Sequence, residues 1–378
     1  MDLERVGSEA DRRAAETEAL RRLPDDLAAM VVDTGLLRQW VAARYGGAEA
    51  DIPTVLDAIE TLAFHDGSTA WFAMIGATTG LASGYLPEHW AHTIYGDPRA
   101  VTGGFAMPSG SALPVDGGLR VNGRWQWGSG THHCTWIGGG CWVEDQAGQR
   151  TARPDGLVAP FVFFAPEQVE LLDTWHVAGL KGTGSTDYTV TDALVPEGRW
   201  VQFLNRGPIV DAPLYRFPFL GALALGVCAV AVGLARRAQH ELVLLAAGKR
   251  PAQSSRLLAE RPVVQMQVAK AEAAWRSSRA LVREVVEEAW QAASADGGVG
   301  PEHRRRVRLA AANAASRAAE AVDLMYHAGG GSSIHESSAL QRVFRDVHVL
   351  TQHGIVAERI YEPIGRMALG LPTDGSQL

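Results

Sequence analysis

The residues best suited to chemistry in this sequence are one serine in a glycine-rich run and two histidines. Ser129 lies in the run Trp127–Gly130, where a hydroxyl group is flanked by flexible backbone. His348 and His353 lie close together, and imidazole is the side chain that most often moves protons near neutral pH. Each residue also has an ordinary structural role open to it, because Ser-Gly pairs form turns and single histidines lie on many helices. A functional argument therefore has to come from their combination with other motifs.

The sequence lacks the common signatures of nucleotide and metal sites. It contains no GxGxxG after a strand-like run and no GxxxxGK[ST], so neither a Rossmann dinucleotide site nor a P-loop is indicated. The segment Thr131–Cys134, even with Cys141, offers too few ligands for zinc, and we expect no metal. Three cysteines are too few for a disulfide framework, so we expect a reducing, cytoplasmic location.

The composition is that of a globular protein. Hydrophobic residues make up 47% of the 378 residues and charged residues 20%, and a net charge of −7 predicts neither a nucleic-acid nor a membrane partner. Residues 1–22 are charged and have no apolar core, so we expect no signal peptide. The run Phe217–Ala235 has nineteen residues without a charge, but its amphipathic continuation favours a buried bundle helix over a membrane span.

The elements that must position these residues change type twice along the chain. Apolar spacings of three and four predict helices over Leu27–Tyr45 and over Ile52–Phe64, where Pro53 suits a first turn. Short β-rich runs separated by Gly, Pro and Asp occupy residues 102–200, and helical spacing returns after them. We therefore predict an α+β fold with a helical domain over 1–100, a central antiparallel, barrel-like β domain over 101–205 and a helical bundle over 206–378.

Three short motifs, in this order, resemble the acyl-CoA dehydrogenase fold. The run Gly123–Gly130 followed by Trp136 resembles the family's segment in which a Trp-x-Thr/Ser unit lies against the flavin ring. The run Trp175–Pro196 is similar to the second β-domain signature, and Ala328–Asp346 is similar to the glycine-rich turn and Arg-Asp pair near the end of the fold. The resemblance covers most of the chain and implies the helix–sheet–helix order.

One position separates this sequence from the dehydrogenases of that family. Those that place their base after the Arg-Asp pair have a Glu there, which removes a proton from an acyl thioester, whereas Arg345-Asp346 is followed at that spacing by His353-Gly354. The segments Asp66–Trp71 and Arg345–His353 instead resemble the two-component flavin-dependent monooxygenases. This branch implies oxygenation of a small organic substrate by reduced flavin and O2 through a C4a-hydroperoxyflavin.

Two alternatives stay open at the level of sequence. Glu260 or Glu288 could supply a base from another helix, which would make the chain a flavin-retaining acyl-CoA dehydrogenase or oxidase. A non-catalytic binding or assembly member of the fold would carry the same motifs.

The monooxygenase resemblance implies a role for each candidate residue. The implied catalytic residues are Ser129, bonded near flavin N5, and His353, acting on oxygen. The implied cofactor-binding residues are Phe105, Trp127, Ser129, Gly130, Thr183, Ser185, Gly330 and Gly331. The implied substrate-binding residues are Trp71, Thr78 and Gly354. Phenol hydroxylases of this branch carry a His near the position of Thr78. No His lies there in this sequence, which favours an aromatic, heterocyclic or amine substrate over a simple phenol.

The same resemblance implies the cofactor and the partners. FAD-binding relatives place a Phe and a Gln near the adenosine diphosphate, but Ser254 and Pro262 occupy those positions here, which favours reduced FMN over FAD. The chain has no nicotinamide-binding motif, so we expect a separate NAD(P)H-flavin reductase. The apolar helices offer more apolar surface than one bundle can bury, which predicts a homotetramer built as a dimer of dimers.

Overall fold

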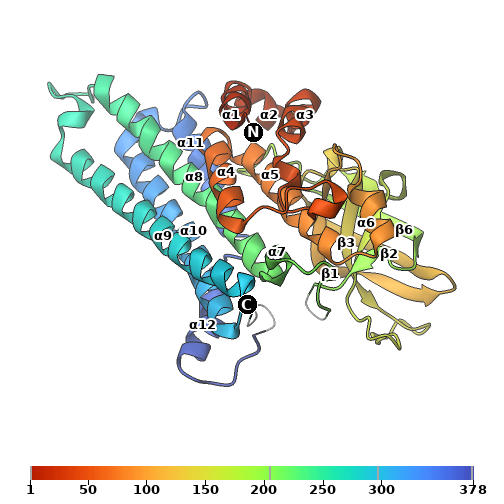
Figure 1. Ribbon diagram of the computed structural model, residues 1–378. Coiled ribbons are helices and arrows are strands. Elements are labelled where there is room, and N and C mark those ends of the chain that lie inside the picture. Colours follow the sequence, from red (N-terminus) through yellow and green to blue (C-terminus); the bar gives the residue numbers. More distant parts are fainter. Residues whose placement is uncertain (1, 204–205, 296–297, 376–377) are drawn as a thin grey trace.

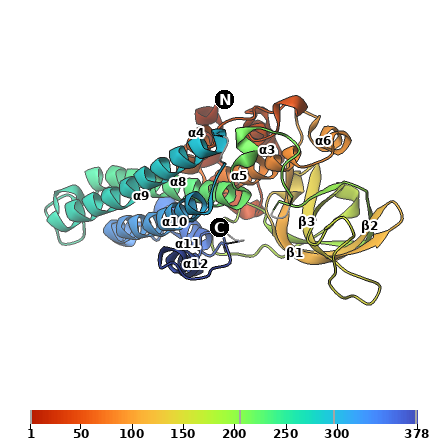
Figure 2. The ribbon, with the colours of Figure 1, turned by 60° about the horizontal axis from the view of Figure 1, so that its bottom comes forward.

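The structure is a computed structural model and describes residues 2–203, 206–295, 298–375 and 378. Helices come first, a sheet follows, and a bundle of long helices completes the described chain (Figure 1). The bundle forms one end of the molecule and the sheet forms the other (Figure 2). This confirms the predicted α+β architecture. The expected domain boundary at residue 205 lies outside the described residues.

The first part of the chain contains short helices. These are α1 (Leu3–Arg12), α2 (Ala14–Leu20), α3 (Asp25–Asp33), α4 (Ile52–His65), α5 (Gly67–Gly80) and α6 (Glu88–Tyr95). The prediction of one helix over Leu27–Tyr45 was wrong: α3 ends at Asp33 because Gly35 takes a left-handed conformation (φ 75°), and only three-ten turns follow. Helix α4 forms where expected, with Pro53 in its first turn.

The central part is a seven-stranded sheet with the order β5-β6-β2-β1-β3-β4-β7. Its strands are β1 (Thr102–Val115), β2 (Gly118–Gly128), β3 (Trp136–Val143), β4 (Phe161–Phe164), β5 (Glu170–Leu172), β6 (Thr186–Pro196) and β7 (Trp200–Val201). The sheet is mixed rather than purely antiparallel, because β1 and β3 run parallel. After β2 the chain turns back at the edge where β1 begins and starts β3 on the other side of β1. Ser129 lies in this turn.

The last part consists of α7 (Pro213–Arg216), α8 (Phe219–Gly248), α9 (Pro262–Ser294), α10 (Pro301–Gly329), α11 (Ala339–Thr351) and α12 (Tyr361–Ala368). Helix α8 is long and apolar enough to cross a membrane, but 78% of its most apolar window is buried inside the molecule. This confirms the prediction of a buried bundle helix for Phe217–Ala235.

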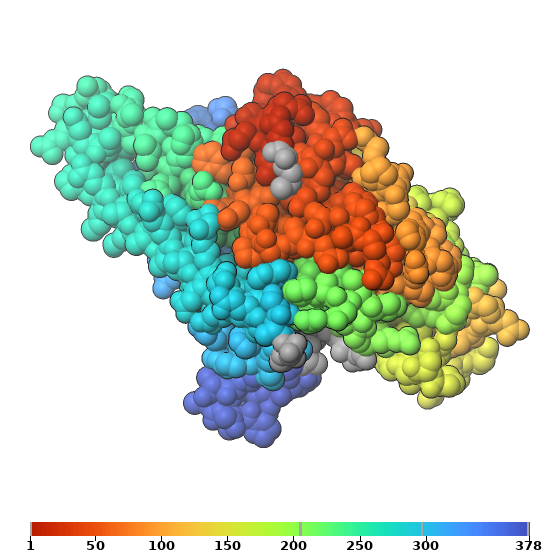
Figure 3. All heavy atoms as spheres, in the orientation of Figure 1, coloured from red at the N-terminus to blue at the C-terminus, as the bar shows by residue number. Residues whose placement is uncertain are grey.

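One hydrophobic core joins the first helices to the bundle, and the sheet has a second core of its own. Helices α4 and α5 pack on α8, so the N-terminal helices lie over the junction between the bundle and the sheet (Figure 3). The junction therefore brings together side chains from all three parts of the chain.

Candidate active site

Trp71, Ser129 and His353 meet at this junction, although they come from α5, from the turn after β2 and from the turn after α11. The indole Nε1 of Trp71 donates a hydrogen bond of 3.0 Å to Ser129 Oγ. The rings of Trp71 and His353 meet edge to face, with centroids 5.5 Å apart. Three residues that sequence analysis placed in one site thus form one continuous wall.

The backbone around this wall leaves little freedom. Asp66 caps α5 by accepting a hydrogen bond of 2.7 Å from the Thr69 amide, which fixes the start of the helix that carries Trp71. Gly130 has φ 70°, and a Cβ there would lie 2.6 Å from the ring of Phe72. Only glycine fits at that position, so the turn that carries Ser129 is held against α5.

Ser129 is also connected to the loop that precedes β6. Its Oγ lies 2.7 Å from Ser185 Oγ, and Ser185 Oγ lies 2.6 Å from Thr183 Oγ1. The register of β2 and β6 sets Gly128 opposite Thr186 and so brings Ser129 beside Ser185. Thr183 and Ser185 therefore lie behind the Ser129 hydroxyl and contact it directly or through each other.

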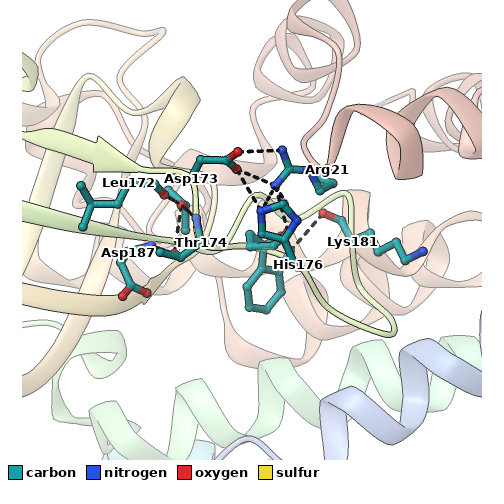
Figure 4. Close-up of polar contacts among 9 residues, drawn as sticks. Arg21, Leu172, Asp173, Thr174, His176, Lys181 and Asp187 are labelled. Atoms are coloured by element: carbon teal, nitrogen blue, oxygen red, sulfur yellow. Dashed lines mark hydrogen bonds and ion pairs between the residues drawn. The ribbon is translucent and has the colours of Figure 1, made fainter.

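That loop is anchored from both sides. Arg21, at the end of α2, reaches across to Asp173 (2.5 Å) and to the ring of His176 (Figure 4). From the bundle, Arg345 donates to the Ala178 carbonyl (2.6 Å), and the buried carboxyl of Asp346 accepts from the Leu180 amide (2.6 Å). The Arg-Asp pair thus holds the loop on which Thr183 and Ser185 are carried.

The sequence suggested that His353 lies on a helix. It lies instead in a turn, because α11 ends at Thr351. Burial, with a smaller contribution from the positive charge of Arg308, lowers the pKa of His353 to about 4. Its Nδ1 accepts a hydrogen bond of 3.3 Å from the Ile355 amide, so the proton of the neutral ring is on Nε2. At neutral pH this imidazole is an uncharged donor.

Arg308 is the neighbour that sequence reasoning missed. It is buried in α10 and donates a hydrogen bond of 2.9 Å to the Ile355 carbonyl, so it fixes the turn that carries His353. It lies in the run His303–Arg308, of which only Arg304 is exposed, while Arg305 pairs with Glu302. Its signal was its position between two apolar residues, Val307 and Leu309, whereas Arg304, Arg305 and Arg306 are consecutive.

Trp127 provides an aromatic surface next to the Ser129 turn. Its side chain is 56% exposed and its backbone takes a left-handed conformation (φ 59°), which is uncommon for so large a residue. The ring of Phe105 meets it edge to face at 5.7 Å. The two rings form an apolar platform open to a ligand.

Some candidates lie outside this arrangement. His348 bonds Asp323 at 2.8 Å on the outer side of α11. Thr78 is 2% exposed, and its hydroxyl donates to the Met74 carbonyl, while this face of α5 packs on Gly226 of α8. Gly354 is exposed directly after His353, and a Cβ there would come within 2.7 Å of the Arg359 guanidinium.

Gly330 and Gly331 are not brought to the Ser129 site within one chain. The preceding residue, Gly329, accepts a hydrogen bond from Lys249, just past the end of α8. Leu234 is the part of α8 that contacts Gly67 at the start of α5. Fifteen residues separate Leu234 from Lys249, which corresponds to about 22 Å along a helix.

Neither candidate dehydrogenase base points to a proton-abstracting site. Glu260 is exposed and accepts from the Leu257 amide, whereas Glu288 pairs with Arg306 on the outer face of the bundle. Across the residues that the structure describes, no group of three or more His, Cys, Asp or Glu side chains is arranged to hold a metal ion. The Thr131–His133 segment is a three-ten turn rather than part of a strand.

Comparisons with known proteins agree with this geometry. Residues 225–358 match the family model described as acyl-CoA dehydrogenase, C-terminal domain. An indole-3-acetate monooxygenase of Pseudomonas putida is 33% identical over 95% of this chain and 90% of its own length. The oxygenase subunit HsaA of a flavin-dependent monooxygenase from Rhodococcus jostii is 30% identical over 95% of both chains.

Among solved structures, the 3-HSA hydroxylase of Rhodococcus sp. RHA1 superimposes with a TM-score of 0.91 at 27% identity, over 100% of this chain and 98% of its own. The similarity spans all three parts of the molecule and includes the segments that carry Trp71, Ser129 and His353. The chain therefore belongs to the flavin-dependent monooxygenases of the two-component type, which have the acyl-CoA dehydrogenase fold.

Proposed function

We propose that this monooxygenase takes up reduced flavin from a separate NAD(P)H-flavin reductase, holds it between Trp127 and Ser129, and oxygenates an aromatic or heterocyclic substrate beside His353. The observation that carries the proposal is the continuous wall of Trp71, Ser129 and His353. It combines a buried hydroxyl, a neutral imidazole donor and an apolar ring, as an oxygen-activating pocket requires.

The residues around Ser129 fit a flavin ring. The exposed face of Trp127, supported by Phe105, offers a flat apolar surface for a tricyclic ring. Ser129 lies two residues further along the same turn, and we assign its hydroxyl to ring N5. When bound, the reduced flavin supplies the electrons that activate O2. The protein's own contribution is to orient the ring, to exclude water with Trp71 and to offer the Nε2 proton of His353 as a hydrogen bond.

We propose FMN rather than FAD as the preferred flavin. At the end of the bundle, Ser254 lies in the loop between α8 and α9, and Pro262 is the first residue of α9. Ser254 has no ring to stack on an adenine, and Pro262 has no donor for a phosphate, as the Phe and the Gln in FAD-binding relatives would have. Reduced FMN is therefore expected to bind at least as tightly as reduced FAD.

The substrate class follows from the walls and from the relatives. No imidazole is available near Thr78 to take a phenol proton, since the described residues of α5 after Trp71 are apolar or are Gly and Thr. One relative is named for indole-3-acetate, an aromatic heterocycle without a phenol. We propose an indole-like or other fused-ring substrate beside His353.

The proposed assembly is a cytoplasmic homotetramer. The apolar run Phe217–Ala235 does not supply the contact surface, because 78% of the most apolar window of α8 is buried within its own chain. Four exposed apolar side chains lie instead near the projecting end of the α8–α9 hairpin, namely Val243, Leu244, Val263 and Met266. A second copy packed there would also bring a Gly330-Gly331 turn towards a neighbouring flavin, which one chain cannot do by itself.

A single-turnover experiment tests the proposal. The protein is mixed with reduced FMN, oxygen and indole-3-acetate, or with a phenol of similar size, and product is measured per oxygen consumed. We expect oxygenated product from the indole and mainly hydrogen peroxide with the phenol. Reduction of a tightly bound flavin by an acyl-CoA, with no product from reduced FMN and oxygen, would instead support a dehydrogenase.

A further inference from the structure

Three hydroxyl groups and one carbonyl form a hydrogen-bond chain behind Ser129. Ser129 Oγ contacts Ser185 Oγ at 2.7 Å, Ser185 Oγ contacts Thr183 Oγ1 at 2.6 Å, and Thr183 Oγ1 contacts the Leu180 carbonyl at 2.9 Å. Ser129, Thr183 and Ser185 are all buried, so water does not compete for these bonds.

The carbonyl at the end of the chain determines where each proton lies. A carbonyl oxygen can only accept, so the Thr183 hydroxyl must donate to Leu180. Thr183 then has no proton left, and Ser185 must donate to Thr183. By the same count Ser129 must donate to Ser185. Three protons fill three contacts, and the opposite direction would leave two oxygen atoms facing each other without a proton.

Trp71 removes a further option at Ser129. Its indole Nε1 can only donate, and it donates to Ser129 Oγ at 3.0 Å. The hydroxyl oxygen therefore gives its proton to Ser185, accepts one from Trp71 and keeps one lone pair. A ligand atom that forms a hydrogen bond with Ser129 Oγ must therefore be the donor.

From this chain we infer that Ser185 and Thr183 are positioning residues that make the site select reduced over oxidised flavin. The inference rests on the proposed function, in which ring N5 meets Ser129. Reduced flavin carries a hydrogen on N5 and is a donor there, whereas N5 of oxidised flavin has only a lone pair and would face the lone pair of Ser129. The reduced flavin delivered by the reductase would then bind, and the oxidised flavin would be released after the reaction.

The direction of these hydrogen bonds is fixed because the loop that carries Leu180 and Thr183 is held in place. The Gly130 amide donates to the Thr183 carbonyl (2.9 Å), and Arg22 forms a β-bridge with Thr183 from the N-terminal segment. A Cβ on Gly179 would collide with the Arg345 carbonyl, so the loop lies directly on α11. The Leu180 carbonyl that sets the direction is thus held in place by the sheet, the first helices and the bundle together.

The test compares dissociation constants for oxidised FMN and for reduced FMN, the latter measured without oxygen. The wild-type protein should bind reduced FMN more tightly. In Ser185→Ala, or in Thr183→Val, the Ser129 proton is released and can turn towards oxidised N5. The ratio of the oxidised to the reduced constant should then fall about tenfold, the effect of one hydrogen bond. The midpoint potential of the bound flavin should fall by about 30 mV with it.

Thr131→Val is the matched control. Thr131 is a buried hydroxyl in the same turn, but it donates to the Gly128 carbonyl (2.9 Å) and is not part of the chain. Its ratio should equal that of the wild type. No preference for reduced FMN in the wild type, or an unchanged ratio in both chain variants, overturns the inference while leaving the flavin site intact. A wild-type protein that binds neither FMN nor FAD in either state would remove the proposed flavin site itself, and this inference with it.

Discussion

The imidazole of His353 packs against Trp71, and burial, with a smaller contribution from Arg308, decides its protonation. With a pKa of about 4, fewer than about one ring in a hundred is charged at neutral pH. Sequence reasoning had treated His353 as an acid–base group near pH 7. The structure makes it a neutral ring that can donate through Nε2, and in the proposed function it would orient a reacting oxygen rather than deliver a proton from a charged ring.

Replacing His353 should therefore uncouple the reaction in a specific way. His353→Ala should lower product per oxygen consumed by about ten- to a hundredfold, because one buried hydrogen bond to a charged group is lost. His353→Gln, which restores an N–H near the Nε2 position, should recover part of this loss. Titration of His353 should add no pH dependence to coupling between pH 6 and pH 8, because its pKa lies well below this range.

His348→Ala is the control for this position, because His348 pairs with Asp323 on the outer side of the helix. It should leave coupling close to that of the wild type. A defect in His348→Ala together with normal coupling in His353→Ala would show that the wrong histidine has been assigned.

Ser129→Ala should affect both stability and coupling. The Trp71 N–H and the Ser185 hydroxyl would lose their shared partner, and a buried unpaired donor costs about 1–3 kcal/mol. Urea unfolding should show this loss, and hydrogen peroxide release per reduced FMN should rise. If both quantities match the wild type, Ser129 is only a turn residue.

At the scale of elements, the buried carboxyl of Asp346 ties α11 to the loop that precedes β6. Burial raises the pKa of Asp346 to about 7, with a further contribution from Asp66, while the Leu180 amide opposes the shift. In the unfolded chain this carboxyl ionises near its ordinary pKa of about 3.9. Between these two values the folded state holds more protons, so the contribution of Asp346 to stability decreases as pH rises from 4 to 7.

Asp346→Asn should remove this dependence, since its side-chain carbonyl can still accept from the Leu180 amide. We expect the free energy of unfolding of the variant to gain on the wild type between pH 5 and pH 8, as measured by urea unfolding. Asp323→Asn, on the outer side of α10, should show no such gain. A parallel pH dependence in the wild type and in Asp346→Asn would contradict a buried neutral carboxyl.

Sequence motifs predicted the elements of the site better than its connections. The Trp-Gly-Ser-Gly run, the Asp66–Trp71 segment and His353 were placed in one site because their order matched a family, and the structure brings them together. The motifs did not reveal the Trp71–Ser129 bond, the role of Arg308 or the distance of Gly330. These depend on how α5, α10 and the end of α8 pack, and packing between distant segments leaves no local pattern in a sequence.

For the whole molecule, the projecting end of the α8–α9 hairpin predicts the contact between copies. Leu244 is 59% exposed and Met266 is 52% exposed, which is costly for apolar side chains in water. Leu244→Glu combined with Met266→Glu should dissociate the proposed tetramer in sedimentation at micromolar concentration and leave the monomer folded. Gln291→Glu, on the exposed surface near the other end of α9, should leave the assembly unchanged. A monomeric wild-type protein would contradict the prediction.

The meeting of three distant segments at one wall also has a consequence during synthesis. Ser129 is made early, but more than two hundred residues must follow before His353 exists. At ~5–20 residues per second this takes tens of seconds, and folding proceeds from the N-terminal side meanwhile. A nascent chain has the platform of Trp127 without the histidine that directs oxygen. The Leu180 amide also has no Asp346 carboxyl to donate to at that stage. The loop behind Ser129 is therefore fixed only after α11 has been synthesised. In the proposed function, a firm flavin site would therefore form only once synthesis has passed α11.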